Sequence, residues 1–291
     1  MTGDVRPVSR ETKMLLSVFV ALTALATTVL YVRSADTADW FAWTIQPPLT
    51  AAFLGGGYGA GFLMVVLALR TRAWAHARVP VVTVTAFTAL TLAATLLHRD
   101  RFHFGADGAV PRFAAWFWLG VYLVVPVALV LLAVRQQRMP GRDPEREEPL
   151  PRWLAAVLTV QGAIMLVVGV LLFAAPSTAR TLWPWALTPL TARVVAAWLV
   201  AFGIAAVLAL AERDLQRLEI SAIAFLAFGL LQLIALARYG STVRWGSATA
   251  TAYLVVLLSV PPTGAAGWWI AVRGRRRRAA GAPREAAVPA R

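Results

Sequence analysis

Two histidines and an aspartate within one short segment are the residues of this chain best suited to chemistry. The segment reads LHRDRFHFGADGAVPR and contains His98, Asp100 and His103. Imidazole and carboxylate groups bind zinc and other first-row metals, and the same groups act as general acids and bases. The spacing H-x-D-x-x-H is not an established metal signature. A loop whose charges pair locally, for instance Asp100 with Arg99 or Arg101, is the alternative interpretation.

A neighbouring loop holds two more carboxylates that could join the same site. Asp36 and Asp39 follow the first long apolar stretch and, in the topology given below, share the outer side of the membrane with the histidine segment. The corresponding later loop, RYGSTVRWG at 238–246, has no histidine and no acidic residue. We therefore predict a ligand-binding site that includes Asp36, Asp39, His98, Asp100 and His103, and a metal site formed by His98, Asp100 and His103.

A glycine run, GGGYGAG at Gly55–Gly61, is the other feature that occurs once. A dinucleotide-binding loop is excluded because that motif needs a preceding strand and a soluble βαβ unit. Gly55 with Gly59, and Gly57 with Gly61, form G-x-x-x-G pairs, which are typical of closely approaching membrane helices. The alternative is a locally broken helix that lines a cavity. In that case Gly57 and Gly61 are further ligand-binding candidates.

The elements that must position these residues are membrane-spanning helices. Hydrophobic residues make up 59% of the 291 residues, charged residues only 14%, and the mean hydropathy is +0.67. Spanning a bilayer takes about 20 consecutive apolar residues, and in lipid such a segment must be a helix. Eight stretches qualify: about 14–32, 49–69, 80–97, 113–134, 153–175, 191–211, 220–237 and 248–272. The predicted fold class is an all-α, polytopic membrane helix bundle with eight transmembrane helices.

The distribution of basic residues predicts the orientation of the chain. Of the 28 Lys and Arg residues, 20 fall on the side that holds both termini and 8 on the other. Positive charge resists translocation, so both termini are predicted to be cytoplasmic. The first apolar stretch, Met14–Val32, is longer than the roughly 7–15 residues of a signal-peptide core, so it is predicted to stay in place as a helix. The expected location is the bacterial cytoplasmic (plasma) membrane.

A phrase that occurs twice indicates an internal repeat. WFAWTIQPPLT at 40–50 is echoed by LWPWALTPLT at 182–191, and Trp43 and Trp185 are 142 residues apart. The first and fifth apolar stretches, and the third and seventh, keep nearly the same spacing. Four spans per copy is an even number, so the copies share one orientation and should be related by an axis along the membrane normal. The sequence thus predicts two tandem parallel four-helix repeats.

The repeat sets the expected domain boundaries and a role for the phrase itself. The predicted parts are a first membrane repeat at 1–134, a cytoplasmic linker at 135–152, a second membrane repeat at 153–272, and a basic, disordered cytoplasmic tail at 273–291. Thr188 and Pro189 fit the N-cap and first position of a helix. Indole rings suit the headgroup zone of a membrane, which is the place predicted for Trp40, Trp43, Trp183 and Trp185.

The net charge of +14 suggests a polyanionic partner. The positions of the basic residues indicate whether that partner is nucleic acid or anionic lipid. The basic residues flank apolar spans and form no face with interleaved aromatics, so no nucleic-acid partner is predicted. The arginine-rich tail is expected to contact anionic headgroups of the lipid bilayer. The chain has no cysteine, so no disulfide or thiolate ligand exists. The sequence gives no oligomeric state.

The two Trp-Pro phrases, with HRDRFHF between them, resemble a group of uncharacterised multi-pass membrane proteins of high-GC actinobacteria. The resemblance covers nearly the whole chain. It implies a multi-pass membrane protein and assigns no activity, ligand or site residue.

Two classes of function follow from the sequence. The first is a non-enzymatic protein that binds or moves a small or lipidic ligand, or that supports other membrane components. The alternative is a membrane-embedded enzyme, possibly metal-dependent, with its centre at the outer face of the first repeat. No acidic residue and no Arg, Lys or His lies at the middle of a predicted span, which argues against a proton-coupled pump. Standard soluble-enzyme motifs are absent, so no cofactor is predicted.

Overall fold

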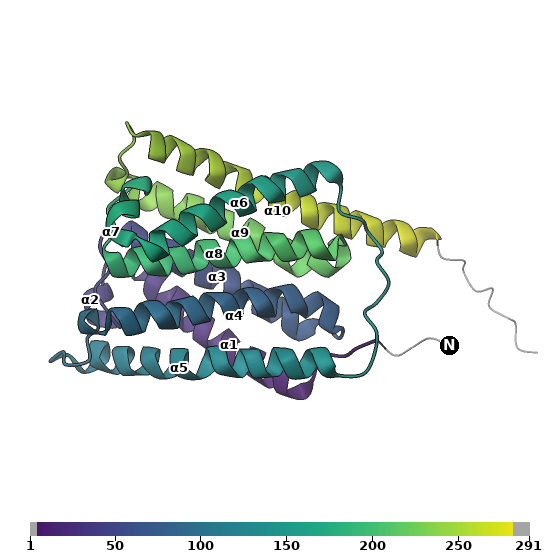
Figure 1. Cartoon of the computed structure of the whole chain (residues 1–291), viewed down its shortest axis with the longest axis horizontal. Helices are drawn as coiled ribbons and strands as arrows, with labels where there is room; N and C mark the ends of the chain where they lie inside the picture. The colour runs from purple at the N-terminus through teal and green to yellow at the C-terminus, as the bar shows by residue number, and fades with distance from the viewer. Residues whose placement is uncertain (1–4, 282–291) are drawn as a thin grey trace, which may run out of the picture.

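The computed structural model describes residues 5–281, and its long helices run side by side in one bundle (Figure 1). Eight helices are long and apolar enough to cross a membrane, as expected of an integral membrane protein. They are α1 (Arg10–Thr27), α3 (Pro48–Arg70), α4 (Trp74–Leu97), α5 (Ala109–Arg138), α6 (Arg152–Ala174), α8 (Pro189–Glu212), α9 (Leu215–Tyr239) and α10 (Ala248–Gly281). The all-helical class and the number of candidate spans are therefore confirmed.

The two ends of the bundle differ. Short helices α2 (Thr37–Trp40) and α7 (Pro176–Ala179) lie at one end, which we call the loop end (Figure 1). The segment 139–151, which joins α5 to α6, lies at the opposite end together with the first and last described residues. We call this the linker end. A π-helical turn, Thr28–Val32, extends α1 toward the loop end.

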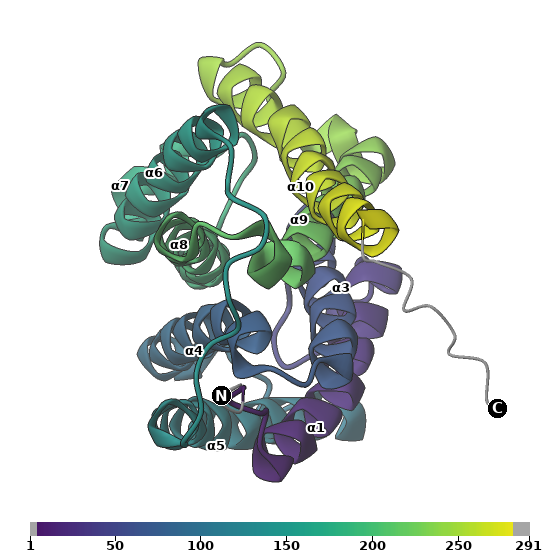
Figure 2. The same cartoon turned by 90° about the vertical axis from the view of Figure 1, so that its right-hand side faces the viewer.

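In a view along the bundle, α3, α4, α8 and α9 lie toward the middle, and α1, α5, α6 and α10 lie outside them (Figure 2). In the first half of the chain, α1 packs on α3 and α4 packs on α5; in the second half, α6 packs on α8 and α9 packs on α10. The two halves meet through contacts of α3 with α9 and of α4 with α8. The inner helices α3, α4, α8 and α9 thus carry the contact between the halves.

Helix starts follow local sequence signals. The Thr188 hydroxyl accepts from the Thr191 N–H at 3.2 Å, and Pro189 occupies the first helical position. This confirms the predicted start of α8, where proline's missing donor is not needed. The prediction of a disordered C-terminal tail at 273–291 is wrong in part, because residues 273–281 continue α10 as helix. Residues 282–291 lie outside the described residues.

Three of the four tryptophans that were predicted to suit the headgroup zone are buried inside the protein. Trp43 is 2% exposed and Trp185 is 0% exposed, and Trp183 is also buried. Trp43 packs against Phe41, Phe102 and Trp118, and the Trp185 indole donates to Thr50 Oγ1 at 2.9 Å. Only Trp40, at 42% exposure, remains at the surface. The tryptophans of the phrase therefore fill the interior of the bundle at the loop end.

The glycine run permits close helix contact, and α3 is unbroken from Pro48 to Arg70. The broken-helix alternative is thus wrong. A Cβ at Gly55 would lie 2.5 Å from the backbone nitrogen of Tyr31, and one at Gly57 would lie 2.6 Å from the ring of Trp198. Gly56 makes room for Gln232, whose amide donates to the Phe53 carbonyl at 2.9 Å. The run lets α1, α8 and α9 approach α3 together.

Candidate functional site

The structure places the predicted polar site at the loop end but gives its members separate partners. Both ring nitrogens of His103 are engaged: Nδ1 is 3.0 Å from the Phe41 carbonyl and Nε2 is 3.1 Å from Thr44 Oγ1. A carbonyl only accepts, so Nδ1 carries the proton and Nε2 accepts from the threonine. His103 therefore anchors the phrase that precedes α3.

His98 faces a cation instead of a carboxylate. Arg193 Nη1 lies 2.5 Å from His98 Nε2 and, because guanidinium only donates, the imidazole nitrogen is the acceptor. Burial, and then the Arg193 charge, lower the pKa of His98 below its ordinary value. His98 is thus held neutral as a link between α4 and α8.

The acidic candidates do not complete a metal site. Asp100 pairs with Arg101 at 3.1 Å, and both side chains are exposed, as in the local-pairing interpretation. Asp36 and Asp39 are exposed on α2. Within residues 5–281, no three His, Cys, Asp or Glu side chains come together in a group that could hold a metal ion. The metal hypothesis at His98, Asp100 and His103 therefore has no assembled ligand set.

The neutral state of His98 predicts a pH dependence of stability. The unfolded chain takes up the His98 proton near pH 6.5, while the folded protein takes it up only at lower pH. The free energy of unfolding therefore decreases as pH falls below about 6.5. The His98→Gln variant has an amide oxygen that can still accept from Arg193 but does not titrate. In this variant, the decrease in stability that His98 protonation causes should disappear. Unfolding measured between pH 7.5 and 5 checks this. An unchanged pH profile in the variant would contradict the assignment.

An apolar cavity of about 360 Å³ lies inside the first half of the bundle. Its walls come from α1, α3, α4 and α5, and α8 contributes Trp198 and Phe202. Gly57 and Gly61 are among the lining residues, so two of the predicted ligand-binding residues do border a cavity. The polar candidates Asp36, Asp39, His98, Asp100 and His103 do not line it. The site that the structure offers is therefore apolar and deeper than the sequence suggested.

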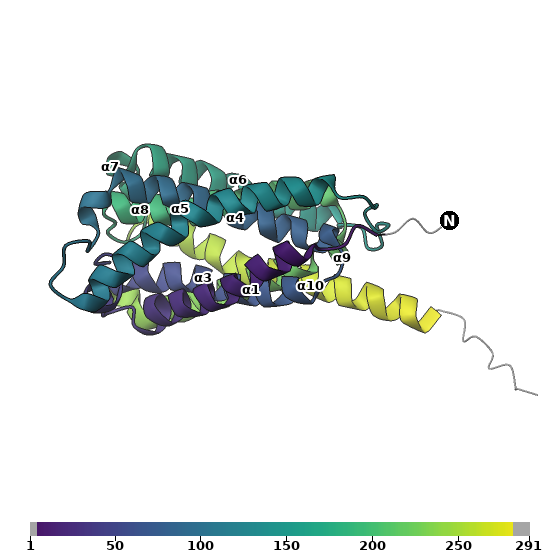
Figure 3. The same ribbon diagram turned by 90° about the horizontal axis from the view of Figure 1, so that it is seen from below.

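The cavity opens sideways between α1 and α5. Lining residues on these helices are exposed at the bundle surface, including Leu25 on α1 at 53% and Phe113 on α5 at 68%. Figure 3 shows α1 and α5 together on one face of the bundle. This surface is apolar, so in a membrane the opening faces lipid tails and not water.

The cavity wall carries few polar groups. Thr23, Thr83 and Thr88 donate to carbonyls of their own helices at 2.6, 2.8 and 2.9 Å, so their protons are used. The hydroxyls of Tyr58 on α3 and Tyr122 on α5 bond to each other. No described residue that lines the cavity is charged. The tyrosine pair is therefore the main polar feature of the wall.

The second half contains smaller internal spaces. One of about 270 Å³ is lined by Trp183, Tyr253 and Phe228, and another of about 100 Å³ lies beside Gln161. Gln161 is occupied in holding α6 to α10, since its amide donates to Ser259 at 2.8 Å and Thr263 at 3.1 Å. The two halves thus differ in how much room they leave inside.

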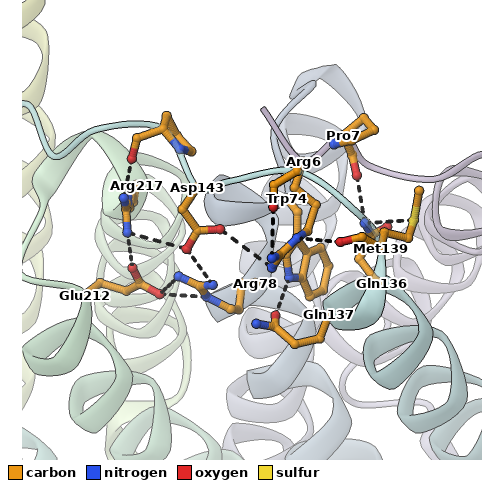
Figure 4. Close-up of polar contacts among 12 residues, drawn as sticks. Arg6, Pro7, Trp74, Arg78, Gln136, Gln137, Met139, Asp143, Glu212 and Arg217 are labelled. Atoms are coloured by element: carbon orange, nitrogen blue, oxygen red, sulfur yellow. Dashed lines mark hydrogen bonds and ion pairs between the residues drawn. The ribbon is translucent and has the colours of Figure 1, made fainter. Parts of the chain in front are cut away.

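A buried ion-pair network closes the linker end (Figure 4). Glu212 at the end of α8 accepts from Arg78 of α4 and, at 3.0 Å, from Arg217 of α9. Arg78 also donates to Asp143 of the linker at 2.9 Å, and Arg6 lies 3.8 Å from the same carboxylate. The network ties the linker and the N-terminal segment to both halves. The sequence showed these residues only as charges at helix ends.

No family model, curated protein or solved structure matches this chain. Its function is therefore inferred from its own residues.

Proposed function

We propose that this membrane protein binds a small apolar or lipid-like molecule in the cavity of its first half. One observation carries the proposal: an uncharged cavity of about 360 Å³ that opens between two helices onto an apolar surface. Small-molecule sites are typically concave, mostly apolar and about 300–1,000 Å³ in volume. The ligand reaches such a site by lateral movement from the bilayer.

The cavity also supports binding over catalysis. Its lining contains no histidine, carboxylate or lysine that could serve as an acid, base or nucleophile. The residues of the enzyme hypothesis lie outside it, each bonded to a different partner. The proposed role is therefore retention or movement of a membrane-soluble molecule.

A cavity-filling substitution tests the proposal. A Cβ at Gly61 would have only Thr23 Cγ2 within 4 Å, at 3.9 Å, so Gly61→Phe places a ring in the cavity without a backbone clash. We expect it to weaken binding of labelled 2-methylnaphthalene at least about tenfold, a loss of about 1.4 kcal/mol. Binding is measured on protein in phospholipid nanodiscs, with partition into empty nanodiscs subtracted.

Gly120→Phe is the matched control. Gly120 lies on the exposed face of α5, and a Cβ there would meet no atom within 4 Å. Both variants replace a helical glycine by phenylalanine, so they share the change in helix propensity. Gly120→Phe should bind the probe as the unmodified protein does. Equal binding by all three proteins, or none above the empty nanodiscs, would overturn the proposal.

We further propose that the chain consists of two tandem four-helix repeats related by an axis along the membrane normal. In this repeat α1 corresponds to α6, α3 to α8 and α4 to α9. The α3–α9 contact then corresponds to the α8–α4 contact, and the α1–α3 contact to the α6–α8 contact. Backbone bonds recur with their atoms displaced by 141 or 142 residues. The pairs are Val8 N–Arg72 O with Leu150 N–Arg213 O, Trp74 N–Arg6 O with Leu215 N–Glu148 O, and His103 N–Ala42 O with Arg244 N–Pro184 O.

The repeat also explains His103. Arg244 occupies the corresponding position, and its side chain donates to the Trp183 carbonyl at 2.5 Å, just as His103 reaches the Phe41 carbonyl. Two different side chains thus perform the same anchoring role in the two halves. This supports a structural role for His103. An experimental structure whose halves superpose only after inversion would contradict the repeat.

The proposed orientation has both termini in the cytoplasm of a bacterial cell, with the protein in the plasma membrane. The support is the excess of basic residues at the linker end, including Arg142, Arg146 and Arg213. The arginines of α10 beyond Arg273 are expected to lie near anionic headgroups. A reporter fused after residue 281 should be active on the cytoplasmic side, and activity outside would reverse the orientation.

A further inference from the structure

The Tyr58–Tyr122 pair leaves a hydrogen-bond donor unused at the cavity wall. Only one proton can lie between the two hydroxyl oxygens, so the second hydroxyl proton needs another acceptor. No such acceptor bonds to either hydroxyl among residues 5–281. Both tyrosines are buried, and a buried donor without a partner costs about 1–3 kcal/mol. The pair is therefore poised to bind an acceptor atom that the protein does not supply.

A second donor without a partner belongs to a residue of the same wall. Trp198 of α8 lines the cavity and is buried, and its indole N–H has no partner in the described part of the chain. The Trp198 ring lies 5.5 Å from the Tyr58 ring, edge to face. By contrast, Trp118 donates to Thr95 Oγ1 at 3.0 Å. The Trp198 nitrogen is itself enclosed by protein atoms and the threonine protons are already used, so among these groups the free proton of the tyrosine pair is the donor available to a ligand.

The rest of the wall favours a neutral ring. Phe87 stacks on Trp198 with ring centroids 3.9 Å apart, and Trp118 lies 4.3 Å from Tyr122. Aromatic side chains prefer offset or edge-to-face contacts with other rings. An ionised group is disfavoured, because no charged residue lines the cavity and burying an unpaired charge is costly. An acyl chain alone would leave the free proton of the tyrosine pair without an acceptor.

We propose that the cavity takes a neutral, membrane-soluble ring compound bearing a carbonyl oxygen, which accepts a hydrogen bond from the Tyr58–Tyr122 pair. The inference rests on the proposed function and adds the chemical class of the ligand. The volume of about 360 Å³ is roughly twice that of a cavity that holds one benzene ring, about 150 Å³. One or two fused rings therefore fit inside, while an apolar tail leaves through the opening beside Leu25 and Phe113.

Two probes that differ in their carbonyl groups test the inference. Menadione is a neutral naphthoquinone, and 2-methylnaphthalene has the same ring skeleton and methyl group without the oxygens. In the nanodisc assay we expect the unmodified protein to bind menadione about five- to tenfold more tightly than the hydrocarbon, the effect of one hydrogen bond to a buried donor. The double variant Tyr58→Phe/Tyr122→Phe should lose this preference while its affinity for 2-methylnaphthalene changes less than about twofold.

The control variant is Tyr253→Phe, which removes a hydroxyl from the cavity of the second half. It should keep the preference for menadione. If the unmodified protein binds both probes equally, or if the double variant keeps the preference, the ligand class is wrong while the cavity proposal stands. If Gly61→Phe leaves the binding of both probes unchanged, the proposed function fails and this inference fails with it. The preference of the unmodified protein needs no variant, so misfolding of the double variant does not prevent the test.

Discussion

Glu212→Ala is expected to destabilise the folded protein by about 3–5 kcal/mol, the loss typical when one partner of a buried ion pair is removed. Glu212 holds Arg78 and Arg217, and all three side chains are largely buried at the linker end. Without it, Asp143 is the carboxylate within residues 5–281 that still pairs with the two guanidinium groups. The measurement is the free energy of unfolding of detergent-solubilised protein in an SDS titration.

An exposed ion pair at the same end provides the control. Glu11 lies 3.2 Å from Arg135, and both side chains are about half exposed or more. Such pairs contribute about 0–1 kcal/mol, so Glu11→Ala should change stability little. If Glu212→Ala and Glu11→Ala have equal effects, the network does not hold the two halves together.

Gly55→Ala is expected to be the most damaging single-methyl change in α3. The added Cβ would lie 2.5 Å from the Tyr31 nitrogen and 2.6 Å from the Leu30 carbonyl carbon. These are backbone atoms, so no side-chain rotation relieves the clash and α3 must move away from the end of α1. Overpacking typically costs about 1–3 kcal/mol, and we expect the upper part of that range.

Gly61→Ala, six residues along the same helix, should have the opposite sign. A Cβ there meets only Thr23 at 3.9 Å, which is ordinary contact. Alanine is favoured over glycine inside a helix by up to about 1 kcal/mol, so this variant should be neutral or more stable. Unfolding of both variants in SDS compares them directly. Equal stability of the two variants would contradict the close approach of α1 to α3.

The membrane-spanning helices could be predicted from the sequence because each depends on a local run of apolar residues. Long uncharged runs require helices in lipid, and Thr188 with Pro189 marked the start of α8 correctly. The burial of Trp43 and Trp185 could not be predicted, because an indole ring suits a headgroup zone and a packed interior equally well. What decides between them is the set of rings around Trp43 and Trp185, which comes from distant parts of the chain.

The cavity could not be predicted in the same way. It is lined by residues of α1, α3, α4 and α5, and its volume depends on how these helices pack. The glycines gave a partial signal, since Gly57 and Gly61 were selected as candidates and do line the cavity. His98 and His103 were selected for their chemistry, yet Arg193 occupies Nε2 of His98 and the Phe41 carbonyl occupies Nδ1 of His103. The two histidines suggested metal binding or acid–base chemistry, but in the fold their contacts give them structural roles.

A structure determined from protein extracted with its native lipids tests the central claim most directly. We predict density for a non-protein molecule between α1, α3, α4 and α5, within hydrogen-bonding distance of the Tyr58 or Tyr122 hydroxyl, with part of it leaving between Leu25 and Phe113. A cavity without density, or one closed by α1 packing against α5, would contradict the proposal that this protein binds a molecule there.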